Sequence, residues 1–210
     1  MDEAALRAWL AEPRTELIAA VAEGVRAHVA TLRARGLDFY GYALVPAPYY
    51  EIRRLFAAAN AEAGAFAAPN RSSEGRSQTA AALGDAPPAP LGDETNGRYR
   101  YCVEAWKHWE YEFPIDVAVL DGLHERFRSL HPKREGARGM DKFEIAHADA
   151  LLDAVARGLE VARDGGAFGE ATPFLVVWVC GPGFRRAIEG FARRLNPPQR
   201  AADFLKEFGG

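Results

Sequence analysis

The longest apolar run of the chain is Phe174-Leu175-Val176-Val177-Trp178-Val179-Cys180. Its apolar residues do not alternate with polar ones, a pattern typical of a strand that is covered on both faces. The glycines and proline of residues 181–183 then turn the chain, and the pattern from Phe184 to Leu195 predicts a helix. We therefore expect 174–180 to be a central strand of a sheet with both of its faces buried.

Three more segments have the composition of strands. Residues 39–45 are rich in aromatic and β-branched side chains, and Pro46 and Pro48 enforce a turn before a second strand from Arg53 to Ala59. These two segments predict a hairpin with a longer loop. From Arg98 to Val103, arginine and aromatic residues alternate with period two, which predicts a further, half-buried strand.

Apolar residues at helical spacing predict the helices between these strands. The clearest helix runs from Thr15 to Arg35 and ends at Gly36, a residue typical of helix C-termini. The other predicted helices cover 2–10, 114–130, 141–163, 184–195 and a short segment with Phe204, Leu205 and Phe208. This order predicts one α/β or α+β domain over residues 1–210, in which a small mixed sheet of about four strands is packed with helices.

The composition limits the size of the core. Hydrophobic residues make up 49% of the 210 residues, but 40 residues are alanine, and Leu, Ile, Val and Phe together number 47. Large apolar residues nearly vanish from 69 to 97, where Ser, Gly, Pro, Ala and Asp dominate. Burial of such a segment cannot offset its ordering entropy. We expect a flexible insertion or surface loop within the single domain.

Charge and targeting signals narrow the class of protein. The formal net charge of -3 removes the global electrostatic reason to expect nucleic-acid binding. The acidic start Met1-Asp2-Glu3 is unlike a signal peptide, and the run at 174–180 is too short to cross a bilayer. We expect a cytoplasmic protein without a membrane partner. Its two cysteines, Cys102 and Cys180, are expected to be free thiols in a reducing cytosol.

The histidines predict no metal site, and no cofactor is expected. His124 and His131 are seven residues apart, which separates their imidazoles by about 10 Å along a helix, too far to share a zinc ion. His147 lies on the apolar stripe from Phe143 to Leu151. We expect it to be a core histidine that is hydrogen-bonded to the backbone.

The helix predicted at 184–195 is rich in arginine. Arg186 and Arg193 fall on a shared helical face and are candidates for an anion site. The alternative is a solvated face with an ion pair between Arg185 and Glu189, which would contribute little to stability.

Cys102 and His108 are the closest approach to a nucleophile and a base. Thiolate chemistry requires a base within hydrogen-bond reach of a partly exposed sulfur. The six-residue spacing across a strand end does not determine that geometry. The alternative is a packed thiol beside a surface histidine.

The densest aromatic cluster lies between Trp106 and Phe113. Aromatic residues near arginine make good anchors in protein interfaces. We expect Trp106 to complete the core, and we select Arg98, Arg100, Trp109 and Tyr111 as the candidate binding surface.

These landmarks resemble the bacterial DUF4303 family. The motifs are Phe39-Tyr40-Gly41-Tyr42-Ala43-Leu44, Ala58-Ala59-Asn60-Ala61-Glu62, Tyr99-Arg100-Tyr101, Glu104-Ala105-Trp106-Lys107, Gly166-Ala167-Phe168-Gly169 and Leu195-Asn196-Pro197-Pro198. The resemblance covers approximately residues 14–205 without the insertion. The order and spacing of the motifs support this resemblance. It implies no activity and no catalytic residues. Its size and α/β character are similar to small bacterial proteins that neutralise toxins by binding them.

Two functions follow as hypotheses. The first is a non-enzymatic protein-binding module, of an immunity-like, toxin-neutralising type. The alternative is a small cysteine-dependent hydrolase or transferase that uses Cys102 and His108.

Overall fold

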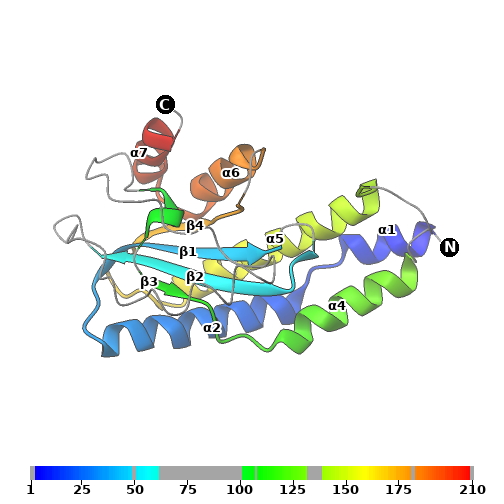
Figure 1. Cartoon of the computed structure of the whole chain (residues 1–210), viewed down its shortest axis with the longest axis horizontal. Helices are drawn as coiled ribbons and strands as arrows, with labels where there is room; N and C mark the ends of the chain where they lie inside the picture. The colour runs from blue at the N-terminus through cyan, green and yellow to red at the C-terminus, as the bar shows by residue number, and fades with distance from the viewer. Residues whose placement is uncertain are drawn as a thin grey trace, which may run out of the picture.

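The computed structural model describes residues 3–48, 51–61, 101–106, 108–131, 139–180 and 183–208. The insertion predicted at 69–97, together with Arg98 and Arg100, lies outside these residues. Figure 1 shows the elements in chain order, which are α1 (Glu3–Ala11), α2 (Thr15–Ala34), β1 (Phe39–Ala47), β2 (Arg54–Ala61), the 3-10 turn η4 (Val103–Ala105), β3 (His108–Glu110), α4 (Val117–Leu130), α5 (Lys142–Asp164), β4 (Phe174–Val177), α6 (Arg185–Leu195) and α7 (Pro198–Phe208).

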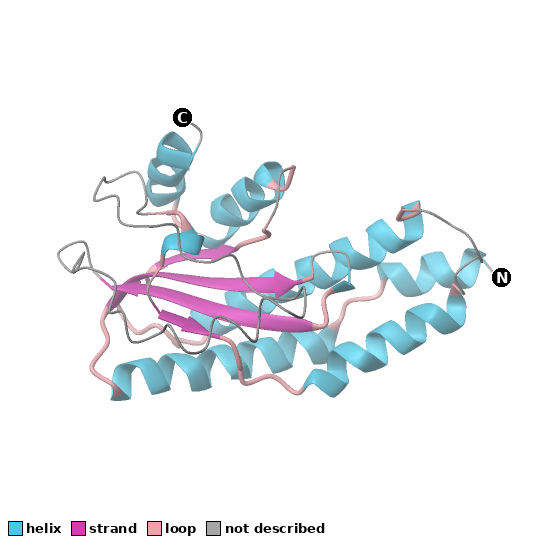
Figure 2. Ribbon diagram, viewed as in Figure 1, coloured by secondary structure: helices cyan, strands magenta, loops and turns pink. Residues whose placement is uncertain are grey.

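The strands form a four-stranded mixed sheet in the order β3-β2-β1-β4. β1 and β2 are antiparallel, with Leu44 opposite Ala57, and they form the predicted hairpin. β4 runs parallel to β1, with Leu44 opposite Val177. Figure 2 shows helices on both sides of this sheet. The predicted fold class, a small mixed sheet packed with helices, is confirmed.

The strand formed by the apolar run does not have the predicted position in the sheet. β4 is buried on both faces, as predicted, but it borders the described sheet and is not central. The side chain of Asn196 pairs with its outer edge: Leu175 N donates to Asn196 Oδ1 at 2.8 Å, and Asn196 Nδ2 donates to Leu175 O at 2.6 Å. An amide side chain thus satisfies backbone groups that a further strand would otherwise pair.

The strand predicted at 98–103 is wrong over its described part. Residues 101–103 form a turn that leads into η4, and the third antiparallel strand is β3 instead. Tyr101 and Val103 are buried and Cys102 is half-buried, so the alternation was a true burial pattern. Tyr101 packs its ring on Phe174 and Phe204, at centroid distances of 4.8 and 5.5 Å. The pattern therefore reports packing onto the sheet rather than pairing within it.

The helices α2, α4 and α5 cover the first face of the sheet. β1 directs Tyr42 and Leu44 into this layer, where they are fully buried. The hydroxyl of the buried Tyr42 is satisfied by His28 Nδ1 on α2 at 2.9 Å. The helices α2 and α5 approach most closely at Gly158, where an added Cβ would lie 2.6 Å from Val21.

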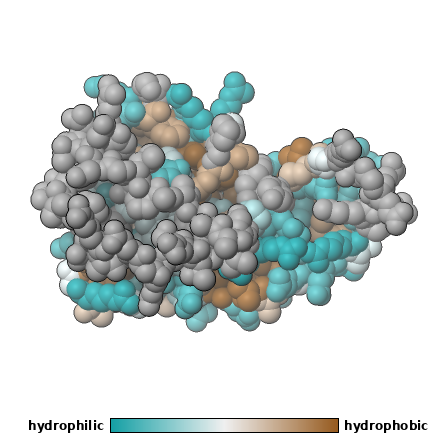
Figure 3. All heavy atoms as spheres, in the orientation of Figure 1, coloured by the Kyte–Doolittle hydropathy of each residue, from teal (hydrophilic) through white to brown (hydrophobic). Residues whose placement is uncertain are grey.

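The second face of the sheet is covered by α6, α7 and the segment 101–106. Its buried residues include Ala43 and Val45 of β1, whose side chains alternate with those of the first face. Trp106 is fully buried against Gly41, because a Cβ on Gly41 would lie 2.7 Å from its ring. Figure 3 shows hydrophobic residues between α6 and α7 and a hydrophilic surface along α4.

A third cluster lies beyond the sheet, where α1 meets the ends of α4 and α5 (Figure 1). Its buried apolar residues are Leu6, Trp9, Phe127 and Phe143. Asp141 begins α5 with a capping box: its side chain accepts from Phe143 N and Glu144 N, and Glu144 accepts from Asp141 N. The cap explains why the predicted start of this helix agrees with the structure to one residue.

Replacing Gly158 by alanine should reduce the free energy of unfolding by about 1–3 kcal/mol, because the new methyl group overpacks the contact between α2 and α5. Gly122 of α4 is the matched control, since a Cβ there meets nothing within 4 Å. Gly122→Ala should therefore raise the stability by up to about 1 kcal/mol through helix propensity alone. Urea unfolding of both variants measures the difference, and equal changes would contradict this close approach.

Candidate functional site

An aromatic surface, which we define as Phe56, Trp109 and Tyr111, lies at the β3 border of the sheet. The rings of Trp109 and Tyr111 are stacked at a centroid distance of 6.3 Å and an interplanar angle of 20°. The rings of Phe56 and Tyr111 meet in a T-shaped arrangement, with a centroid distance of 5.9 Å. Tyr111 is 52% exposed, whereas Trp109 is half-buried against the second face. The structure therefore joins the two aromatic residues selected from the sequence, and adds Phe56 to them.

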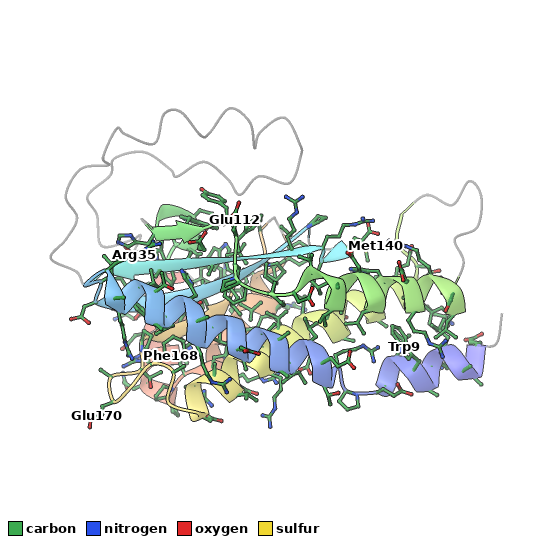
Figure 4. All side chains as sticks on the ribbon, turned by 90° about the horizontal axis from the view of Figure 1, so that it is seen from below. Trp9, Arg35, Glu112, Met140, Phe168 and Glu170 are labelled. Carbon is green, nitrogen blue, oxygen red and sulfur yellow. The ribbon has the colours of Figure 1, made fainter. Side chains whose placement is uncertain are left out.

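The acidic residues next to Tyr111 in the chain do not all share its face of the sheet, because Glu110 pairs with Ala57 and acts on His28 and Tyr42 of the first face. Glu110 and Glu112 stand on either side of Tyr111 in the chain, and Glu112 N donates a hydrogen bond to Glu110 Oε1 at 3.2 Å. Figure 4 shows Glu112 close to β3. Partial burial raises the pKa of Tyr111, so its phenol stays neutral near pH 7. The rings lie on the second face of the sheet, and exposed aromatic rings of this kind can bind cationic side chains.

The segment 101–106 crosses the second face of the sheet. Tyr101 contacts Phe174 of β4, Trp106 covers Gly41 of β1, and His108 lies opposite Ala59 as part of β3. Since β3 and β4 are separated by two strands, at about 4.8 Å per strand, their distance is roughly 14 Å. The crossing places Cys102 toward the β4 border and His108 at the β3 border. The predicted nucleophile and base are thus not brought together.

A carboxylate is the partner that the structure gives to Cys102. Its thiol donates to Glu104 Oε2 at 3.5 Å, and the other oxygen of Glu104 accepts from Trp178 Nε1 at 2.6 Å. Both cysteines are free thiols, as predicted. Burial, with the charge of Glu104, raises the pKa of Cys180 to about 12. A carboxylate near a sulfur disfavours the thiolate, which is the reactive form.

The arginines of α6 are engaged in ion pairs. Arg185 and Arg193 contact Glu189 at 3.0 and 3.6 Å, and Arg186 is exposed on the same helix. Arg194 binds Glu160 of α5 through two nitrogens, at 2.8 and 3.0 Å. Of the two anion-site candidates, Arg193 therefore has a carboxylate within reach, so the alternative of an ion-paired face agrees better with the structure.

The network around Glu160 fastens α6 to α5. Burial alone would raise the pKa of Glu160, but hydrogen bonds from Arg194 and Arg157 lower it overall. The same carboxylate raises the pKa of Arg194. Breaking this partly buried pair would leave an uncompensated charge, so its role is structural.

Sequence reasoning missed a buried polar chain in the third cluster. His124 Nε2 is 2.9 Å from Ile52 O, and His124 Nδ1 is 3.2 Å from His147 Nε2. The ring of His147 stacks on Phe127 at a centroid distance of 4.3 Å. The predicted core position of His147 is confirmed, but its partner is a histidine of another helix rather than the backbone. The spacing of residues within α4 or α5 carries no signal for a contact between the two helices.

The described part of the chain holds no group of three or more histidine, cysteine or acidic residues that could bind a metal ion. Two imidazoles alone do not make a zinc site. Among the same residues, no helix has both the length and the hydropathy needed to cross a membrane.

Fold and site together define a single-sheet α/β protein with helices on both faces and an aromatic surface at one border. A comparison with known families matches residues 21–197 to the domain of unknown function DUF4303. The chain belongs to this family, as its motifs suggested. Neither the curated proteins nor the solved structures contain a match.

Alkylation at neutral pH should show that Cys180 is unreactive. Cys102→Ser leaves Cys180 as the one cysteine of the chain. A pKa of about 12, against an ordinary value of 9.0, leaves about a thousandfold less thiolate. The same variant unfolded in urea is the control.

Cys180→Ser tests Cys102 in the same way. We expect folded Cys102 to react more slowly than the unfolded chain, because its thiol donates to the carboxylate of Glu104. Faster reaction in the folded state would contradict this expectation and favour a cysteine enzyme.

Acid should destabilise the protein through His147. Burial, together with the charges of His124 and Arg14, lowers the pKa of His147 to about 3 from 6.5. Between these values the unfolded chain binds a proton that the folded chain does not, so stability falls as pH drops below 6.5, by up to about 1.4 kcal/mol per unit. His147→Phe should have a shallower slope of unfolding free energy against pH from 6 to 4. Equal slopes in the two proteins would show that His147 titrates normally.

Proposed function

We propose that the chain is a non-enzymatic, cytoplasmic protein-binding module, and that it neutralises a toxin by binding it. The observation that carries this proposal is the stacked pair of Trp109 on β3 and the half-exposed Tyr111 that follows this strand. Exposed aromatic side chains that are held by neighbouring rings bury large areas on binding at little entropic cost. Phe56 holds Tyr111 from the sheet side.

The chemistry of this surface favours a basic partner. The exposed Glu112 follows Tyr111 in the chain, and the whole chain carries a net charge of -3. An arginine or lysine of the partner would meet the π-face of an aromatic ring and a carboxylate together. Proteins that act on nucleic acids present such basic surfaces, so a toxin of that type is the class of partner we propose.

The toxin-neutralising part of the proposal rests on analogy. Size and α/β character resemble small bacterial proteins that neutralise toxins, and fold alone does not define function. The alternative, a hydrolase or transferase using Cys102 and His108, has less support. Its nucleophile contacts a carboxylate, and its proposed base lies across the sheet.

Trp109→Ala with Tyr111→Ala should weaken partner binding by about a thousandfold, because two buried anchors contribute about 2 kcal/mol each. The matched control is Ile145→Ala, which truncates another exposed apolar residue, 45% exposed, on α5. Figure 4 shows Met140, close to it in the chain, far from Glu112 and β3.

The measurement has two stages. Wild type, the double variant and the control are used as baits in cells of the source, and a protein retained by wild type and Ile145→Ala alone is purified for direct affinity measurement. Cells that produce this protein should grow only when wild type or the control is co-expressed. Equal binding by the double variant would overturn the proposed surface, and binding without growth rescue would overturn the toxin-neutralising role.

A further inference from the structure

The buried polar chain of the third cluster ends in polar atoms without a partner. Among the described residues, His147 Nδ1, Arg14 Nε and Arg14 Nη2 are buried side-chain atoms that make no hydrogen bond. Arg14 is 5% exposed and His147 is 4% exposed. A buried polar group without a partner costs about 1–3 kcal/mol, more when it is charged, so three such atoms in one cluster require an explanation.

The tautomers along the chain follow from its first member. The carbonyl of Ile52 can only accept, so His124 Nε2, at 2.9 Å, must carry the proton. Neutral His124 then has a lone pair on Nδ1, and His147 Nε2 must donate to it across 3.2 Å. Neutral His147 is therefore left with a lone pair on Nδ1. The orphaned atom of His147 is an acceptor.

Arg14 presents donors to the same cluster. It lies between α1 and α2, and its Nη1 donates to Trp9 O at 2.9 Å and to Glu12 O at 2.7 Å. These bonds hold the guanidinium, whose carbon lies 4.0 Å from the centroid of the Trp9 ring. The centroid of the same Trp9 ring lies 5.5 Å from that of the His147 ring, so Arg14 and His147 share one aromatic neighbour. Figure 4 shows Trp9 directed from α1 toward α4.

The unpaired atoms of Arg14 are hydrogen-bond donors and that of His147 is an acceptor, and this difference selects the ligand. Arg14 Nε and Nη2 are N–H donors, whereas His147 Nδ1 is an acceptor. A bridging molecule must accept from Arg14 and donate to His147. A chloride ion can accept but has no proton to give a neutral imidazole. Hydrogen phosphate has a proton, but it would bring a charge of -1 to -2 into a buried cluster that has one guanidinium, and a metal cation would be repelled by that guanidinium.

We propose that Arg14 and His147 form a buried binding site for a single water molecule, which accepts from the guanidinium and donates to His147 Nδ1. The water completes a hydrogen-bond chain from Ile52 through His124 and His147 to Arg14. Buried waters characteristically bind polar groups that the protein leaves unpaired. This hydrogen-bond chain connects the turn between α1 and α2 to α4 and α5. The site therefore stabilises the packing of α1, α4 and α5 in the third cluster.

NMR spectroscopy of the full chain tests the site. At pH 7 the nitrogen-15 shifts of His124 and His147 should show the Nε2–H tautomer, and a slowly exchanging water should give cross-relaxation to Arg14 Nε–H and to the His147 ring. Chloride and inorganic phosphate should leave these signals unchanged. A saturable shift with either ion would identify an anion site and overturn the proposal.

Other outcomes also overturn it. An Nδ1–H tautomer at His147 would leave donors on both sides, and a scalar coupling between Arg14 and His147 nitrogens would show a direct hydrogen bond without water. Exchange of Arg14 Nε–H as fast as that of Arg7, which is exposed on α1, would show an open guanidinium.

A pair of variants assigns the water to Arg14. Arg14→Met should abolish cross-relaxation from water to His147 and raise the pKa of His147, since the guanidinium charge lowers it. Arg7→Met is the control and should change neither. A water contact that persists in folded Arg14→Met would overturn the bridge, and if that variant does not fold, the wild-type spectra decide.

Discussion

The burial of both faces of one small sheet is the constraint on which this structure depends. Along β1 the fully buried side chains alternate, Tyr42 and Leu44 toward α2 and α5, Ala43 and Val45 toward α6 and α7. A sheet that is apolar on both sides needs a cover on each, and α2 and α5 supply one of them. The second cover is thinner, because α6 and α7 are short helices and leave the segment 101–106 to complete it.

The structure gives a physical reason for the family motifs, because their residues contact one another and the strands of the sheet. Asn60 Nδ2 donates to the hydroxyl of Tyr40, Trp106 covers Gly41, and Asn196 pairs with the edge of β4. These contacts hold strands together or fill the space above them. The motifs by which the chain is placed in DUF4303 thus describe its fold, while the aromatic surface lies beside them at the β3 border.

The helices and the hairpin could be predicted because apolar periodicity and caps are local properties. Asp141 and Glu144 mark the start of α5 within four residues of sequence. The strand predicted at 98–103 failed because alternation reports burial on one side, which packing against Phe174 produces as well as strand pairing does. For the candidate site, Trp109 and Tyr111 could be selected together because both belong to one aromatic segment, whereas Phe56 joins them only through the pairing of β2 with β3.

By itself, the sequence determined the helices, the hairpin, the double-sided burial of residues 174–177 and the family, because each depends on short segments and their order. The tertiary structure alone decided that β4 borders the sheet, that Cys102 and His108 lie apart, and that His124 meets His147. These outcomes depend on which distant segments come into contact. Residue spacing along one helix or strand fixes the direction of a side chain, but its partner is set by how whole elements pack around the sheet.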